Sequence, residues 1–258
     1  MNNTIRGLKK NKNFLIVVLH KSVSVFQIDD DQNSFSLEYN YELKIRKNLR
    51  LNIISTAESG IGEVMSIPGT SKTKLQIYHL RENRVILDLK VHKSRVLVAC
   101  LNSNATLIAT VSKKARRIKV FNIKGELIHE IERTKTRFLP VEKLLFSPCS
   151  RLLVCGDTSR LVHFYKLDIK KLMEPGKAVF QRKKTTRRST KENASLYFSH
   201  FVLPTPMDAI GGTHVVGFNV SCIGKLALVV NERYERILMY EISEHENKLT
   251  LKISEPTC

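Results

Sequence analysis

The residues of this chain that could do chemistry are mainly basic. The sequence holds 43 lysines and arginines against 24 aspartates and glutamates, which gives 258 residues a formal net charge of +19. Such a balance favours a polyanionic partner, meaning nucleic acid, an acidic protein or the anionic face of a membrane. Charge alone does not choose among the three.

Patterns for catalysis and metal binding are missing from the sequence. It has no phosphate-cradling glycine loop, no zinc-protease motif and no serine nucleophile elbow, and its eight histidines are not spaced as metal ligands. The five cysteines include no CxxC pair, which favours reduced thiols over a disulfide framework. We therefore predict a protein that is not an enzyme, with no cofactor, no metal site and no small-molecule substrate.

The most basic segment covers residues 168–193, with nine lysines and arginines against three acids. One interpretation is a solvated insertion without fixed structure. The other is a loop that contacts an anionic surface, where each basic residue contributes about 1 kcal/mol. The candidate membrane-contacting residues of this loop are Arg182, Lys183, Lys184, Arg187 and Arg188.

The elements that must position these residues follow from a repeated six-residue pattern: apolar, any, apolar, aromatic, any, apolar. It occurs at residues 23–28, 75–80, 118–123, 162–167 and 237–242. Such alternation predicts a strand covered on both faces. The aromatic positions stand 52, 43, 44 and 75 residues apart, and a period in the low forties is typical of four-stranded propeller blades. We therefore predict an all-β propeller of WD-repeat type with about five blades, in which residues 1–258 form one domain.

Shorter apolar runs predict the other strands. The first blade is expected to begin near residue 13, with strands over 14–19, 23–28 and 35–43, and the second with a strand over 49–56. The long last interval leaves about 30 residues in excess of the repeat. We therefore expect the basic loop 168–193 as an insertion in the penultimate blade, before a strand over 196–203. No apolar signal region or membrane span is present, which favours a cytoplasmic location.

Two consecutive blades of the chain resemble a known family. The run VHKSRVLVACLNSNATLIATVSKKARRIKVFNI and the later run VEKLLFSPCSRLLVCGDTSRLVHFYKL resemble neighbouring blades of the PROPPINs, the phosphoinositide-binding, WD-repeat-like propellers of autophagy. The family has seven blades, so the resemblance implies that the first two are lacking here. It also implies a peripheral membrane scaffold for phosphatidylinositol 3-phosphate and/or 3,5-bisphosphate. Such a scaffold is recruited to phagophore, endosomal or vacuolar membranes and works with autophagy proteins.

The family carries a lipid signature, FRRG, between these blades, and its two arginines serve two neighbouring headgroup sites. Here that position reads IERT, residues 131–134. The resemblance implies one site made of Arg133, Thr158, Ser159 and His163, and another that includes His92 and Ser112. Without the resemblance, the two histidines are ordinary hydrogen-bonded residues at strand ends.

Departures from the family pattern leave two alternatives open. Glu132 replaces the first signature arginine and would repel a phosphate, while Asp157 stands where the family has serine. Both favour a lipid-blind propeller that acts only as a platform for protein–protein interactions. Nucleic-acid binding rests on charge alone, because no aromatic residues for base stacking are interleaved with the basic ones. The sequence therefore favours a partner other than nucleic acid.

The basic loop generates a testable expectation. Changing Arg182, Lys183, Lys184, Arg187 and Arg188 to serine should sharply lower binding to anionic vesicles, because each charge near the surface contributes about 1 kcal/mol. The unfolding temperature should stay nearly unchanged, since surface positions lack core contacts. Vesicle flotation and thermal unfolding measure the two effects. Thr185→Ala with Thr186→Ala is the matched control, and unfolding of the serine variant would show instead that the segment is structural.

Overall fold

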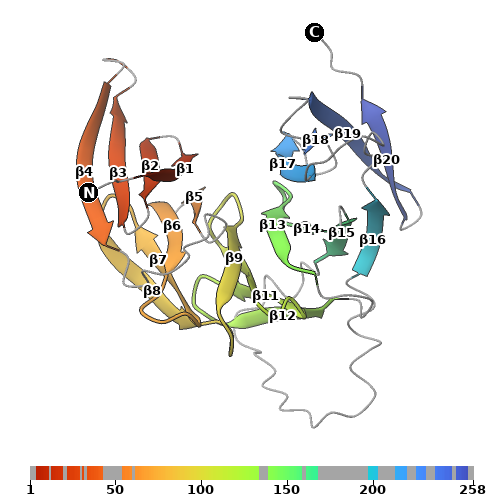
Figure 1. Ribbon diagram of the computed structural model, residues 1–258, viewed down its shortest axis with the longest axis horizontal. Coiled ribbons are helices and arrows are strands. Elements are labelled where there is room, and N and C mark those ends of the chain that lie inside the picture. The colour runs from red at the N-terminus through yellow and green to blue at the C-terminus, as the bar shows by residue number, and fades with distance from the viewer. Residues whose placement is uncertain are drawn as a thin grey trace. The chain divides into compact units, whose positions relative to one another are not determined.

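The computed structural model describes most of the chain up to Leu167 and, beyond it, the backbone of five strands. The described residues are 4–11, 13–19, 22–29, 31, 34–42, 54–59, 62–133, 139–158, 161–167, 197–202, 213–219, 225–230, 236–245 and 248–254. All regular elements among them are β-strands, grouped in five four-stranded sheets (Figure 1).

Each sheet uses four strands that follow one another along the chain, and neighbours in sequence are hydrogen-bonded neighbours in the sheet. The first sheet contains β1 (Ile5–Lys10), β2 (Phe14–Leu19), β3 (Ser22–Asp29) and β4 (Ser34–Glu42). The second contains β5 (Ser55–Ser59), β6 (Gly62–Pro68), β7 (Lys74–His79) and β8 (Arg84–Lys90). The third contains β9 (Val96–Leu101), β10 (Leu107–Ser112), β11 (Arg117–Asn122) and β12 (Leu127–Glu132). The fourth contains β13 (Val141–Phe146), β14 (Leu152–Asp157), β15 (Leu161–Lys166) and β16 (Tyr197–Val202). The fifth contains β17 (Thr213–Asn219), β18 (Lys225–Val230), β19 (Arg236–His245) and β20 (Lys248–Ser254).

The repeated hexapeptide occupies the same place in every sheet. Its five copies fall on β3, β7, β11, β15 and β19, each the third strand of its sheet. The aromatic side chains of Phe121 and Tyr165 are buried in equivalent strands, with 5% and 1% of their surface exposed. The repeat therefore marks one strand of a recurring four-stranded blade, and the predicted all-β propeller architecture is confirmed.

Two strand boundaries differ from the sequence prediction. The first sheet begins with β1, whereas we expected the first blade to start near residue 13. This edge strand is mostly exposed and carries Gly7 among basic residues, so it shows no apolar alternation. In the second sheet, β5 extends to Ser59, beyond the predicted end at residue 56, and residues 43–53 lie outside the described part. The basic loop 168–193, also outside it, connects β15 to β16 along the chain.

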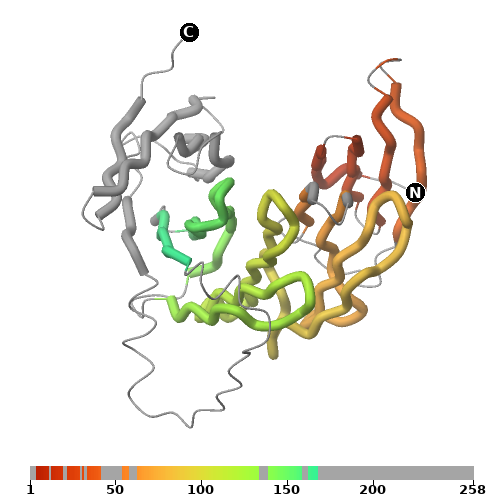
Figure 2. Tube along the Cα trace, turned by 180° about the vertical axis from the view of Figure 1, so that it is seen from behind, coloured from red at the N-terminus to blue at the C-terminus, as the bar shows by residue number. Residues whose placement is uncertain are grey.

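The chain divides into two compact units, one of Met1–Lys113 with Lys119–Glu126, the other of Lys114–Ile118 with Leu127–Cys258. In the first unit, the first and second sheets share an apolar core. Ile16 and Val25 pack with Met65 from the second sheet, and all three are fully buried. A second cluster joins the second sheet to strands of the third. The chain runs back and forth through these sheets, as the Cα trace of Figure 2 shows.

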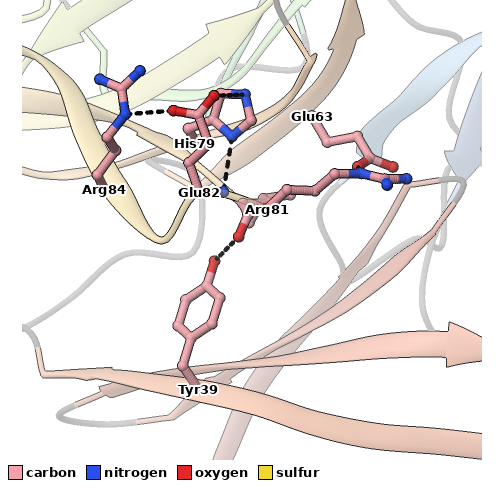
Figure 3. A network of polar contacts seen from close by, with 7 residues as sticks. Tyr39, Glu63, His79, Arg81, Glu82 and Arg84 are labelled. Carbon is pink, nitrogen blue, oxygen red and sulfur yellow. Dashed lines mark hydrogen bonds and ion pairs between the residues drawn. The ribbon is translucent and has the colours of Figure 1, made fainter.

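Polar contacts also join the first and second sheets, as Figure 3 shows for part of the network. The buried carboxylate of Glu63 accepts a hydrogen bond from Arg81 Nε at 2.6 Å and another from the Asn13 side-chain amide. The Tyr39 hydroxyl donates to the carbonyl oxygen of Leu80 at 3.1 Å. A buried charge needs such partners to offset its desolvation. These contacts therefore fix the β7–β8 turn against the neighbouring sheet.

The turn between the first two strands is built alike in the third and fourth sheets. Ala105 and Ser150 have positive φ angles of 54° and 61°, and their N–H groups donate to the carbonyls of Asn102 and Ser147 at 3.1 and 2.8 Å. The side-chain oxygens of Asn102 and Ser147 each accept the N–H five residues further on, at 2.9 and 3.0 Å. Asn and Ser commonly stabilise turns in this way. The shared geometry shows that the two blades repeat one structural unit.

Gly69 generates a prediction for the fold. A Cβ atom at this position would lie 2.6 Å from Cβ and 2.9 Å from the carbonyl carbon of Lys74, at the start of β7. The Gly69 N–H also donates to the Lys74 carbonyl at 3.1 Å, so the two segments cannot separate without losing that bond. We expect Gly69→Ala to lower the free energy of unfolding by about 1–3 kcal/mol.

Chemical denaturation measures this change, with Thr70→Ala as the control because Thr70 is the exposed neighbour. Equal stability of the two variants would contradict the close packing of the β6–β7 turn.

Candidate functional site

Two strands of the fourth sheet bring Asp157 and His163 to one face. Cys155 of β14 lies opposite His163 of β15 in the antiparallel register. Side chains two apart on a strand share a face, so Asp157 lies on the same face as Cys155 and His163. Asp157 and His163 are 5% and 7% exposed. The carboxylate of Asp157 and the imidazole of His163 are thus buried together at the end of β14.

Arg133, which directly follows β12, enters this pair from the preceding blade. Its Nη2 donates to Asp157 Oδ2 at 2.5 Å. Its Nη1 donates to two backbone carbonyls, those of Ala115 and Leu139, at 2.9 Å each. The two carbonyls fix the plane of the guanidinium and aim its remaining N–H groups at the acidic residue.

His163 contacts the same carboxylate oxygen. Its Nε2 lies 3.5 Å from Asp157 Oδ2, an ion pair when the imidazole is protonated. Its ring stacks on that of Tyr165 two residues further along β15, with centroids 6.4 Å apart. Two nitrogen donors, one from Arg133 and one from His163, therefore converge on a single oxygen atom of Asp157.

The Arg133–Asp157 pair is almost fully removed from water, with 4% and 3% of the two side chains exposed. Removing one partner of a buried ion pair typically costs about 3–5 kcal/mol, because the other charge is left buried and uncompensated. Arg133 is also incompletely satisfied, since its Nε is buried without a hydrogen-bond partner among the described residues. One edge of the guanidinium, formed by Nε and Nη2, thus carries a single hydrogen bond instead of two.

The pKa of the Cys155 thiol indicates that the surroundings of this cluster have low polarity. Burial raises the pKa of its thiol to about 12, Arg133 opposes the rise, and Asp157 adds to it. A thiol with so high a pKa stays protonated at neutral pH and is a poor nucleophile. Cys155 is therefore a packing residue beside the ion pair, not a reactive group.

The other residues assigned to this site lie nearby in the sequence. Thr158 follows Asp157 directly and is exposed, and its N–H donates to the carbonyl of Pro140 at 3.2 Å. Ser159 lies outside the described residues, as do the five basic residues of the loop 168–193. The structure thus brings together Arg133 and His163, with Thr158 exposed directly after the end of β14.

The residues assigned to the first headgroup site lie in the other compact unit. His92 precedes β9, is 7% exposed, and its Nε2 lies 3.1 Å from the Thr110 hydroxyl oxygen within hydrogen-bonding distance. Ser112 ends β10 and is equally buried. His92 is thus a buried residue beside the start of β9, within hydrogen-bonding distance of Thr110. Glu132, at the replaced signature position, is partly exposed.

Sequence reasoning identified Asp157 as a departure from the family but missed its direct pairing with Arg133. No sequence signal pointed to this pairing, because the two residues are 24 positions apart and belong to different blades. The two carbonyl acceptors, from Ala115 and Leu139, had no sequence signal because any residue supplies a carbonyl.

The described residues contain no helix long and apolar enough to cross a membrane. Within the same part of the chain, no group of three or more His, Cys, Asp or Glu side chains could hold a metal ion.

The chain resembles known proteins in sequence and in fold. No family model matches the chain. The chain is 25% identical over 166 residues to WD repeat domain phosphoinositide-interacting protein 1 of Xenopus laevis, a match that covers 64% of this chain and 37% of the relative. It is 28% identical over 92 residues to Autophagy-related protein 18 of Kluyveromyces marxianus, covering 35% of this chain and 18% of the relative. The matched segments thus span little more than a third of the first relative's length and less than a fifth of the second's.

The fold is shared with a solved complex of KlAtg21 with the coiled-coil of AgAtg16, with a TM-score of 0.68 at 16% identity, covering 98% of this chain and 70% of that chain. The five antiparallel sheets and this likeness define a β-propeller of WD-repeat type. The sequence relatives bear out the predicted resemblance to the PROPPINs, and the solved structure shares the fold.

Proposed function

We propose that this chain is a non-enzymatic peripheral membrane scaffold that recognises phosphatidylinositol 3-phosphate and/or phosphatidylinositol 3,5-bisphosphate. The observation that carries the proposal is the convergence of Arg133 and His163 on one anionic oxygen at the end of β14. Donors arranged in this way around a carboxylate suit a phosphate oxygen equally well. Thr158 and Ser159 follow Asp157 in the sequence and would supply hydroxyl groups for the headgroup.

A second contact comes from the basic loop 168–193, which binds the surrounding anionic lipid. Single weak membrane contacts give only reversible attachment, and stable attachment takes two signals. The headgroup site supplies specificity, because a guanidinium recognises phosphate by directed hydrogen bonds. The loop supplies affinity that depends on net charge and falls with salt. His92 and Ser112 would belong to a first headgroup site that Glu132 disables.

The scaffold role extends to protein partners and location. The relatives are named for phosphoinositide interaction and autophagy, and the structural neighbour is a complex with a coiled-coil. We propose recruitment of autophagy proteins to phagophore, endosomal or vacuolar membranes.

A second candidate function is a lipid-blind platform for protein–protein interactions. The observation that favours it is the buried Arg133–Asp157 pair, because a guanidinium already bound to a carboxylate is less available to a lipid. The two candidates differ in one property, which is headgroup preference at equal membrane charge.

Arg133→Ala tests the proposed function. We expect preference for vesicles with phosphatidylinositol 3-phosphate over vesicles matched in charge with phosphatidylserine to fall about 10-fold or more, the scale of a lost charged hydrogen bond. Salt-sensitive binding through the loop should remain. Vesicle flotation at fixed salt, well below the unfolding temperature, measures both.

The matched control is Arg117→Ala, which removes an exposed arginine paired with Glu130 and should leave headgroup preference unchanged. If the wild type and Arg133→Ala show the same lack of preference, the lipid-reader function is wrong and the platform takes its place.

A further inference from the structure

We infer that Asp157 is an internal competitor for the headgroup, whose carboxylate holds the position that a phosphate monoester takes on Arg133. The inference rests on the proposed function, and it identifies Asp157 as the residue that controls headgroup binding at the Arg133 site. Its starting point is the geometry of the guanidinium, in which two of three nitrogen atoms have partners among the described residues and Nε has none there.

A guanidinium binds an oxyanion best through two parallel N–H groups along one edge. In Arg133 the Nη1 group is held by two carbonyls, so the remaining edge is formed by Nη2 and Nε. Asp157 uses only Nη2 of that edge, and Nε stays buried without a partner among the described residues. The carboxylate therefore fills the site incompletely.

A phosphate monoester matches the Nε and Nη2 edge of the Arg133 guanidinium better than the carboxylate of Asp157 does. It offers three acceptor oxygens and a charge of about −1.5 to −2 at neutral pH, against one negative charge on Asp157. One oxygen can bind Nη2 and a second Nε, while His163 Nε2 already faces the oxygen that occupies this position, at 3.5 Å. The three nitrogen atoms that face this position, Nη2 and Nε of Arg133 and Nε2 of His163, can thus all contact one phosphate.

Binding requires that Asp157 leave, because two anions cannot share one buried guanidinium without strong repulsion. Asp157 ends β14, and the next residue, Thr158, is exposed. When a phosphate binds Arg133, the carboxylate must therefore turn away from the guanidinium toward solvent. The headgroup must displace an internal ligand, which lowers the affinity of the site and makes it selective for dianionic phosphate over singly charged lipids.

Asp157→Asn tests the inference, since it keeps the size of the side chain and removes its charge. We expect the preference for phosphatidylinositol 3-phosphate vesicles over charge-matched phosphatidylserine vesicles to rise about 10-fold, the scale of one charge-assisted hydrogen bond. Asp88→Asn is the matched control: it removes the same charge from a half-exposed aspartate paired with Lys74, and should leave the preference unchanged. The double variant Arg133→Ala with Asp157→Asn should lose the preference.

Inorganic phosphate gives a second readout that does not depend on membranes. At ionic strength matched with chloride, phosphate should raise the unfolding temperature of Asp157→Asn more than that of the wild type, because it replaces the missing anion beside Arg133. Asp157→Ser serves the same purpose if the asparagine variant folds poorly. Failure of both variants to fold, without rescue by phosphate, overturns the inference.

The remaining outcomes separate the inference from the function on which it rests. If the wild type shows a headgroup preference that Arg133→Ala removes, and Asp157→Asn does not increase it, Asp157 is no competitor and the function stands. If only Asp157→Asn shows a preference, the inference stands and the wild type is a blocked reader. A response to inorganic phosphate without one to vesicles assigns the site to a free phosphate and contradicts the lipid function. No response of any variant to either probe overturns both.

Discussion

The buried ion pair between Arg133 and Asp157 is the interaction on which the candidate site depends. It joins the residue after β12 to the end of β14, and so connects the last strand of one blade to the second strand of the next. A charge at 4% exposure is tolerated only with partners, and Arg133 finds them in one carboxylate and two carbonyls. The same requirement makes the pair a candidate anion site, because whatever satisfies the arginine must be an oxygen acceptor.

The blade repeat explains why these residues meet. The repeated hexapeptide takes the same place in all five sheets, as the third strand: β3, β7, β11, β15 and β19. The strand alternation in β14 and β15 then places Cys155, Asp157 and His163 on one face. Position on the blade, rather than closeness in sequence, therefore assembles the site.

Much of this was predictable from the sequence, and the reasons are physical. The hexapeptide fixed the third strands because a doubly buried strand leaves no freedom in its apolar positions, as Phe121 and Tyr165 illustrate. The exposed edge strand β1 escaped prediction because nothing constrains its side chains to alternate. In the site, Arg133 and His163 were expected from the resemblance to the PROPPIN blades. Their shared contact with Asp157 was not, since the direction in which a charged side chain turns depends on packing between blades.

The coupling between Arg133 and Asp157 is the most direct measure of this account. A double-mutant cycle of Arg133→Met, Asp157→Asn and both together, followed by chemical denaturation, isolates their interaction from all other contacts. The account predicts that each single change lowers the free energy of unfolding by about 3–5 kcal/mol and that the double variant recovers much of the loss, because no lone buried charge remains. Additive losses in the double variant would contradict it, since they would mean that Arg133 and Asp157 do not depend on one another.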